Sequence, residues 1–259
     1  MAIVGNGSVV SSKEVATAGS SRARPAMASF TCSMGPGQAR IRIFTPAKEV
    51  PFAGHPTLGT AFVIGTSVQL DQIVLETSAG PVPVRLDREA ARVVFGWMSQ
   101  PLPRVIPFDD TPALLTAIHV ERSELPVVAY DNGIRHVFVA LANPTAVASL
   151  KPDLAALARL PDIAVNTFAG QDTKWKTRMF APSSGIAEDP ATGSAAGPLA
   201  VHLVRHGRVA LGSSIEIEQG AEISRPSRLF ARVEGSAEHI SRVEVGGAAV
   251  IVARGEFRI

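Results

Sequence analysis

The pattern of apolar and polar residues changes abruptly near residue 39. Residues 40–44 (RIRIF) alternate charged and apolar side chains, which predicts a strand with one buried face. Other short apolar or alternating runs predict further strands at 73–76, 81–86, 136–141, 215–218 and 229–233. The 22 glycines and 19 prolines favour many turns between short strands over a helical bundle.

Two almost wholly apolar stretches, 60–65 and 198–204, each follow a glycine-containing turn. A helix that is apolar on most faces must be buried on most sides, for instance inside a curled sheet. Pro56 lies near the first predicted helix start, where a missing N–H costs nothing. Ser194 is a candidate N-cap of the second helix.

These elements belong to a duplicated pattern. The run RIFTP at 42–46 returns as RMFAP at 178–182, and each copy leads to an acidic residue, a proline and a glycine. The glycines, Gly54 and Gly193, stand at the same distance after a glutamate in both copies. The repeat predicts an α+β fold of two pseudo-symmetric lobes, each a curled, mostly antiparallel sheet around a central helix.

The candidate chemistry lies at the two helix starts. Unpaired N–H groups and the positive end of the helix dipole make a helix N-terminus an anion site. Two such starts facing one another could hold a substrate carboxylate and stabilise an enolate beside it. His55 and Asp189 would then move or orient protons. Alternatively, the glycines form helix-entry turns, Asp189 is a cap and His55 is a satisfied hydrogen-bonding side chain.

Composition narrows the classes of function. With 46% hydrophobic and 19% charged residues, the chain is not intrinsically disordered. The formal net charge is only +2 and no long run of like charge occurs, so we expect no nucleic-acid partner. Apolar runs are far shorter than the roughly 20 residues of a membrane span, and the N-terminus lacks signal-peptide features. We therefore expect a cytoplasmic protein without a membrane partner.

The single cysteine, Cys32, excludes an internal disulfide and any two-thiol site.

Residues 1–38 differ from the rest of the chain. Ser, Ala and Gly dominate them and no periodicity is sustained, so we expect a poorly ordered segment with candidate strand pieces at 9–10 and 29–31. The expected division is therefore an atypical segment at 1–38, an N-terminal lobe at 39–121 and a C-terminal lobe at 122–259.

Three other features carry weaker expectations. His202 and His206 have the spacing of a helix-borne metal pair, but no third ligand is evident, so we expect no metal site. Trp175 is expected in a partly exposed loop, with stacking on a ring substrate as the alternative. Residues 131–133 (DNG) predict a hairpin turn. Neither a dinucleotide fingerprint nor a P-loop occurs, which argues against a nucleotide cofactor.

The paired motifs resemble those of the PhzF family of phenazine-biosynthesis proteins, which shares the diaminopimelate-epimerase-like fold. The segments that carry the resemblance are 44–46, 49–59, 178–180 and 188–200, with support from 131–139, 165–170, 225–227 and 245–247. It covers about residues 39–259. The resemblance implies an active site between two barrel-like lobes, a homodimer, and an isomerase that needs no cofactor. The implied substrate is a small-molecule carboxylate, dihydro-3-hydroxyanthranilic acid, on which a proton is removed and returned at another carbon.

The resemblance also implies roles for individual residues. His55 and Asp189 match the active-site histidine and aspartate of the family. Gly54, Gly193 and Ser194 match its substrate-binding loop positions.

Two departures limit what the resemblance implies. Related epimerases use one cysteine per lobe, but the corresponding loops here carry Ala53 and Ala191, so a two-thiol racemase is excluded. The acid/base glutamate of the family lies in an Asn-Leu-Ser-Glu motif whose register falls here on Ala26. The nearest upstream carboxylate, Glu14, has a different context. The alternative function is therefore a catalytically silent protein that binds an aromatic carboxylate or partner subunits.

Overall fold

A computed structural model describes residues 10–13, 27–31, 38–44, 49–160, 162–236 and 239–251 of the chain. The strands are β1 (Val10–Lys13), β2 (Met27–Thr31), β3 (Gln38–Phe44), β4 (Glu49–Val50), β5 (Gln72–Thr77), β6 (Gly80–Glu89), β7 (Arg92–Ser99), β8 (Arg104–Ile106), β9 (Val128–Asp131), β10 (Arg135–Ala140), β11 (Ala164–Gln171), β12 (Lys174–Ala181), β13 (Ile186–Asp189), β14 (Ile215–Gln219), β15 (Ser227–Gly235) and β16 (Ile240–Gly247). The helices are α1 (Gly54–Val68), α2 (Thr111–Ala117), α3 (Pro144–Ala148), α4 (Leu154–Ala158) and α5 (Gly193–Arg205), with 3-10 turns η1 (Pro182–Ser184) and η2 (Ala221–Ile223).

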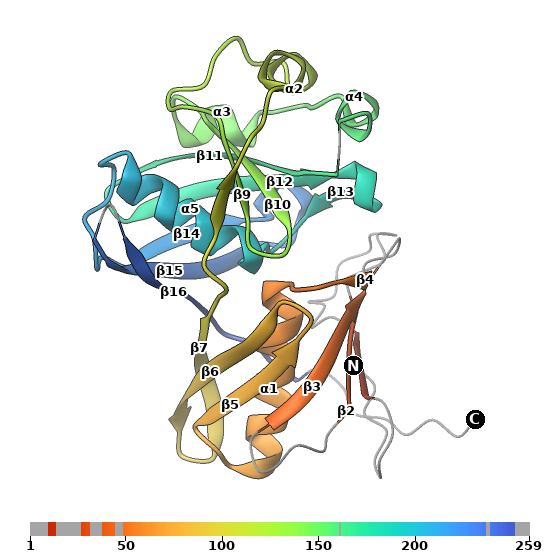
Figure 1. Ribbon diagram of the computed structural model, residues 1–259, viewed down its shortest axis with the longest axis vertical. Helices are drawn as coiled ribbons and strands as arrows, with labels where there is room; N and C mark the ends of the chain where they lie inside the picture. The colour runs from red at the N-terminus through yellow and green to blue at the C-terminus, as the bar shows by residue number, and fades with distance from the viewer. Residues whose placement is uncertain are drawn as a thin grey trace.

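The strands form two lobes with the same internal order (Figure 1). The first lobe has the order β2-β3-β5-β6-β7 and the second has β11-β12-β14-β15-β16 read in the opposite direction along the sheet. Within these two sets of five strands one neighbouring pair is parallel, β3 with β5 and β12 with β14, and the other pairs are antiparallel. The second lobe continues beyond β11 with β10, which is parallel to it, and then with β9 and β8. The lobes join where β7 pairs with β16. This arrangement is the pseudo-symmetric α+β fold expected from the repeat.

The first predicted strand shows how the residue pattern determines the buried face. In β3, Ala39, Ile41 and Ile43 are buried while Arg40 and Arg42 are exposed, because successive side chains of a strand point to opposite faces. The other five predicted strands lie within or overlap β5, β6, β10, β14 and β15.

One helix lies against the sheet of each lobe (Figure 1). Ten of the 15 residues of α1 and 11 of the 13 residues of α5 are buried, as expected for helices that are apolar on most faces. Both helices begin at the glycine of the repeated motif. Helix α1 ends where Gln69 takes a left-handed conformation with φ 56°.

Two local expectations were wrong. The N-cap of α5 is Thr192, and Ser194 is the second residue inside the helix. Trp175 lies in β12 between β11 and β14 and is only 7% exposed, and its indole N–H donates to the carbonyl of Asp172. Trp175 is buried because its indole faces the larger apolar cluster, where its ring centre lies 6.0 Å from that of Phe168, although the two lysines beside it favour a loop.

Apolar residues form two main clusters in the described part of the chain. The larger cluster joins α1, α5 and the strands that wrap them in both lobes. The smaller lies between β9–β12 and the short helices α2, α3 and α4, which lie outside the second sheet (Figure 1). None of the helices described has the length and apolar character needed to span a bilayer.

Within residues 1–38 the structure describes β1, β2 and the first residue of β3. These strands include the candidate pieces at Val10 and 29–31, while Val9 and the rest of the segment lie outside the described residues. The boundary expected at 121/122 stays a prediction. β8 and α2 precede it in the chain and pack with the second lobe.

Candidate active site

The two central helices begin against one another. A Cβ built on Gly54 would lie 2.5 Å from the carbonyl carbon and Cα of Gly193, and 2.7 Å from the backbone nitrogen of Ser194. A Cβ on Gly193 would lie 3.0 Å from Cα of Gly54. Since Cβ atoms do not approach backbone so closely, only glycine at residue 54 allows this contact.

The first backbone N–H groups of both helices lack acceptors. Neither Ala53, the N-cap of α1, nor Thr192 caps its helix with a side-chain hydrogen bond. The N–H groups of Gly54 and His55, and those of Gly193 and Ser194, have no acceptor among the described residues. Two positive helix ends therefore meet at one place, which is the arrangement an anion requires.

His55 joins the first helix start to the loop before the second. Its Nδ1 lies 3.0 Å from the carbonyl oxygen of Ala191. Because a carbonyl only accepts hydrogen bonds, Nδ1 carries the proton in the neutral ring and Nε2 keeps its lone pair. Nε2 is buried and has no hydrogen-bond partner among the described residues. This tautomer can take up a proton through Nε2.

Asp189 ends β13 at the entry to the same loop. It is 9% exposed, and its Oδ2 accepts a 2.6 Å hydrogen bond from the hydroxyl of Thr192. Gln219 fixes this loop, because its Nε2 donates to the Asp189 carbonyl at 2.7 Å and its Oε1 accepts from the Thr192 N–H at 3.1 Å. No hydrogen bond joins Asp189 to His55 in the described structure; the two residues are linked only through the loop at Ala191.

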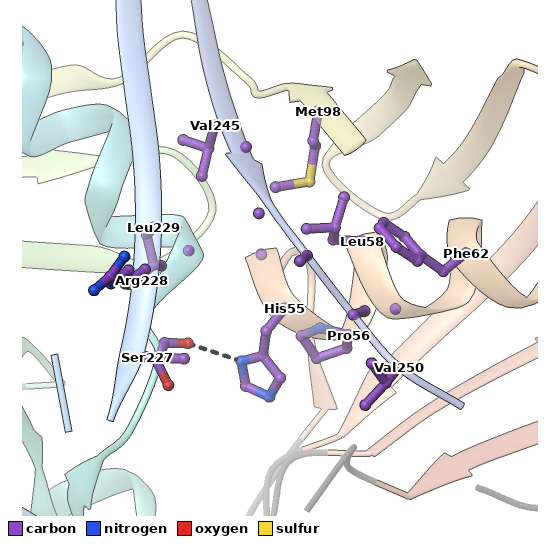
Figure 2. A pocket seen from close by; sticks show the side chains of 18 of the residues that line it. His55, Pro56, Leu58, Phe62, Met98, Ser227, Arg228, Leu229, Val245 and Val250 are labelled. Atoms are coloured by element: carbon purple, nitrogen blue, oxygen red, sulfur yellow. Dashed lines mark hydrogen bonds between the residues drawn. The ribbon is translucent and has the colours of Figure 1, made fainter. Parts of the chain in front are cut away.

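A cavity of about 410 Å³ opens beside the two helix starts (Figure 2). Gly54, His55 and Gly193 line one part of it, whereas Asp189 and Ser194 do not line it. The rest is mainly apolar, with Leu58, Phe62, Met98, Leu229 and Val245 among its walls. Arg225 and Arg228 also line the cavity, and no carboxylate does so among the described residues. The lining therefore fits a mostly apolar molecule that carries a negative group.

Behind the start of α5, the Ser194 hydroxyl contacts a buried histidine. Asn166 Nδ2 lies 3.3 Å from Nδ1 of His136, and Nε2 of His136 lies 3.1 Å from Ser194 Oγ. Burial lowers the pKa of His136 to about 3, although the nearby Asp131 carboxylate opposes this, so the ring is neutral. Asn166 donates to Nδ1, and His136 therefore donates to the Ser194 hydroxyl through Nε2.

The sequence interpretation missed the residues behind the helix start. Gln100, Asn132 and His136 all contact the first two residues of α5. The DNG run by itself predicts a hairpin turn, which it forms between β9 and β10, and residues 131–139 support the family resemblance without assigning a role to Asn132 or His136. The remaining signal in the sequence was Pro198 inside a predicted helix, because a proline there removes a backbone donor.

The His202 and His206 rings lie 4.4 Å apart by their centroids at the C-terminal end of α5, and neither residue lines the cavity. His202 is fully buried and its Nδ1 lies 3.2 Å from the Tyr130 hydroxyl. Across the part of the chain that the structure describes, no group of three candidate ligands accompanies them.

Comparison with known families places the chain. The model of the family described as "Phenazine biosynthesis-like protein" (PhzC-PhzF) matches residues 26–255. The chain belongs to this family. A relative from Pseudomonas aeruginosa named trans-2,3-dihydro-3-hydroxyanthranilate isomerase is 51% identical over 219 residues, which cover 85% of this chain and 79% of the relative. A protein of the same name from Pseudomonas chlororaphis is 48% identical over 219 residues, again 85% of this chain and 79% of the relative.

Solved structures agree with the fold. The structure of a predicted epimerase from Pseudomonas aeruginosa has a TM-score of 0.72 at 28% identity and covers 88% of this chain and 82% of its own. The structure of a probable proline racemase from Agrobacterium radiobacter has a TM-score of 0.61 at 15% identity and covers 85% of this chain and 72% of its own. This similarity shows a common fold and nothing further. As a member of the PhzF family with relatives named as isomerases, the chain is an isomerase. The alternative of a catalytically silent protein finds no support in these relatives.

Proposed function

We propose that this isomerase acts on trans-2,3-dihydro-3-hydroxyanthranilate or a closely similar cyclic amino/hydroxy carboxylic acid. The observation that carries the proposal is the meeting of two uncapped helix starts at an apolar cavity. The names of the relatives at 51% and 48% identity support this substrate class.

In the proposed complex the substrate carboxylate lies at the two helix starts. The N–H groups of Gly54, His55, Gly193 and Ser194 donate to it, and the ring of the substrate lies against the apolar wall. Such preorganised donors also stabilise negative charge that spreads from the ring toward the carboxylate during the reaction. The Ser194 hydroxyl is held by His136, so the contribution of Ser194 comes from its backbone.

The reaction is a proton transfer without net oxidation or reduction. A base removes a proton from one ring carbon, the electron pair shifts into the double-bond system, and a proton is returned at a different ring carbon. His55 Nε2, with its free lone pair, is assigned to proton transfer. Asp189, fixed by Thr192 and Gln219 and close to the same loop, is assigned to orienting or relaying that proton.

The direct test is incorporation of solvent deuterium into the substrate, followed by mass spectrometry. We expect the wild-type chain to incorporate deuterium and His55→Ala and Asp189→Asn to slow it by about 10²–10⁴-fold, as is typical for loss of an acid/base group. His239→Ala and Asp153→Asn are matched controls on exposed residues that do not line the cavity, and they should keep the wild-type rate. Absence of exchange in the wild type would refute the reaction, while unchanged rates in both site variants would refute the residue assignments.

The homodimer implied by the family resemblance stays a prediction. Sedimentation equilibrium should give a mass near twice 27.1 kDa, and a mass near 27.1 kDa at micromolar concentration would contradict it.

A further inference from the structure

Helix α5 contains a proline, its sixth residue, that leaves a carbonyl of the first turn without its backbone donor. In an α-helix the carbonyl of Ser194 would accept from the N–H of residue 198, but Pro198 has none and its ring crowds that carbonyl. The Ser194 carbonyl is therefore left without its usual partner at the helix start where the substrate carboxylate is proposed to bind.

Side chains from two other segments donate to the first two carbonyls of α5. Asn132 Nδ2 lies 2.8 Å from the Ser194 carbonyl oxygen, and Gln100 Nε2 lies 2.6 Å from the Gly193 carbonyl oxygen. Asn132 Nδ2 also lies 3.5 Å from Gln100 Oε1, so the two amides form a chain of donors. The Asn132 Oδ1 atom has no partner within the described residues, so the hydrogen bonds of Nδ2 alone hold the side-chain amide in this orientation.

The positions of these amides depend on both lobes. Gln100 directly follows β7, and its backbone N–H donates to the Val243 carbonyl of β16, at the junction of the lobes. A Cβ at Gly197 would lie 2.4 Å from Gln100 Oε1, so this glycine in α5 leaves room for the amide. Asn132 lies in the β9–β10 hairpin turn, which is tied by a 2.8 Å hydrogen bond from the Gly133 N–H to Asp131 Oδ1.

We propose that Asn132 and Gln100 are positioning residues of the isomerase: the Asn132 amide replaces the backbone donor that Pro198 removes, the Gln100 amide holds the neighbouring Gly193 carbonyl, and together they fix the direction of the free N–H groups of Gly193 and Ser194. The inference rests on the proposed binding of a carboxylate at these groups. A displacement of the first turn by about 1 Å would misdirect the N–H groups, and shifts of this size cost about 10²-fold in enzyme reactions.

The test measures affinity for 3-hydroxyanthranilate by titration calorimetry. This aromatic counterpart of the proposed substrate keeps the carboxylate, so its binding is independent of turnover. We expect Asn132→Ala to weaken the Kd by about tenfold, and kcat/KM for the substrate to fall further than the affinity does, because the same N–H groups bind the carboxylate and stabilise the negative charge that develops during the reaction. Asn143→Ala is the matched control: it removes an amide at the start of α3, far from the cavity, and should leave the Kd unchanged.

A second substitution distinguishes positioning from general destabilisation. In Asn132→Ala/Pro198→Ala, the backbone N–H restored at residue 198 can donate to the Ser194 carbonyl, and we expect the Kd to return to within about threefold of wild type. Gln100→Met supplies the measurement if Asn132→Ala does not fold, with weakened binding again expected.

The outcomes separate this inference from the proposed function. Wild-type binding without deuterium exchange would refute the reaction and leave the positioning role standing if Asn132→Ala binds more weakly. An unchanged Kd in folded Asn132→Ala, a Kd that the double variant does not recover, or no binding of 3-hydroxyanthranilate to the wild type would each overturn the inference.

Discussion

The two copies of the repeat contain the same ion pair in different surroundings. Arg42 and Glu49 in the first lobe make two parallel hydrogen bonds of 3.0 and 2.7 Å, and Arg178 and Glu188 in the second make two of 2.8 Å. Each guanidinium also lies over the phenylalanine two residues later, at 4.9 and 5.0 Å from the ring centre. The side chains are 63% and 37% exposed in the first lobe but only 8% and 11% exposed in the second.

This difference shows that surroundings, rather than geometry, determine what an ion pair contributes. In the first lobe Arg42 lowers the pKa of Glu49, but water competes for both side chains. In the second lobe Arg178 is covered by α3 and also donates to the carbonyls of Val147, Ala148 and Leu150 at the end of that helix. Its removal would leave the Glu188 carboxylate and the carbonyls of Ala148 and Leu150 without these donors, whereas the Val147 carbonyl still accepts from the Leu150 N–H.

The largest expected effect tests this contrast directly. Arg178→Met should lower the free energy of unfolding by about 3–5 kcal/mol, because it leaves a buried charge unpaired. Arg42→Met, the matched substitution in the other lobe, should change it little, since its carboxylate partner is accessible to water. Urea denaturation of both variants measures the difference, and equal losses would show that burial does not distinguish the pairs.

The helix starts are unequal as well. Gly54→Ala should reduce the isomerisation rate by about 10²-fold, because its Cβ would meet backbone at 2.5 Å and push the two starts apart. Gly193→Ala should cost less, since its nearest contact is 3.0 Å. Gly59→Ala, with open space around the added carbon, controls for helix stability and should raise it by about 0.5–1 kcal/mol. A slower steady-state rate for Gly193→Ala than for Gly54→Ala would contradict the expectation drawn from these contact distances.

Sensitivity to acid should come from the second lobe. Burial is the main cause that lowers the pKa of both His136 and His202 from 6.5 to about 3, so between these values the unfolded chain binds protons that the folded chain does not. Stability is therefore complete above about pH 6.5 and falls as the pH drops toward 3, by at most about 1.4 kcal/mol per pH unit for each histidine. Thermal unfolding at pH 8, 6 and 5 measures the slope.

A non-titrating side chain at one of these positions sharpens the test. His202→Gln should make the fall in melting temperature between pH 8 and pH 5 shallower, whereas His239→Gln at an exposed position should keep the wild-type slope. The same slope in His202→Gln as in the wild type would exclude His202 as a source of the acid sensitivity.

Much of the architecture is encoded locally. The alternation at 40–44 determines which face of β3 is buried, and the glycines of the repeat determine where α1 and α5 begin. Those features depend on neighbouring residues and on the period of a strand or helix, so the sequence alone predicts them. The duplicated motif likewise indicated two lobes and selected His55 and Asp189, whose roles stay predictions.

Other features depend on residues far apart in the chain. Only the tertiary structure brings Gly54 against Gly193, covers Arg178 with α3 while leaving Arg42 in water, and places Asn132 beside the carbonyl that Pro198 deprives of a donor. It also buries Trp175, because the face of β12 that carries this residue packs into the larger apolar cluster beside Phe168. Local sequence determines which groups exist and what they need, whereas burial and the choice of partner arise when distant segments pack together and exclude water.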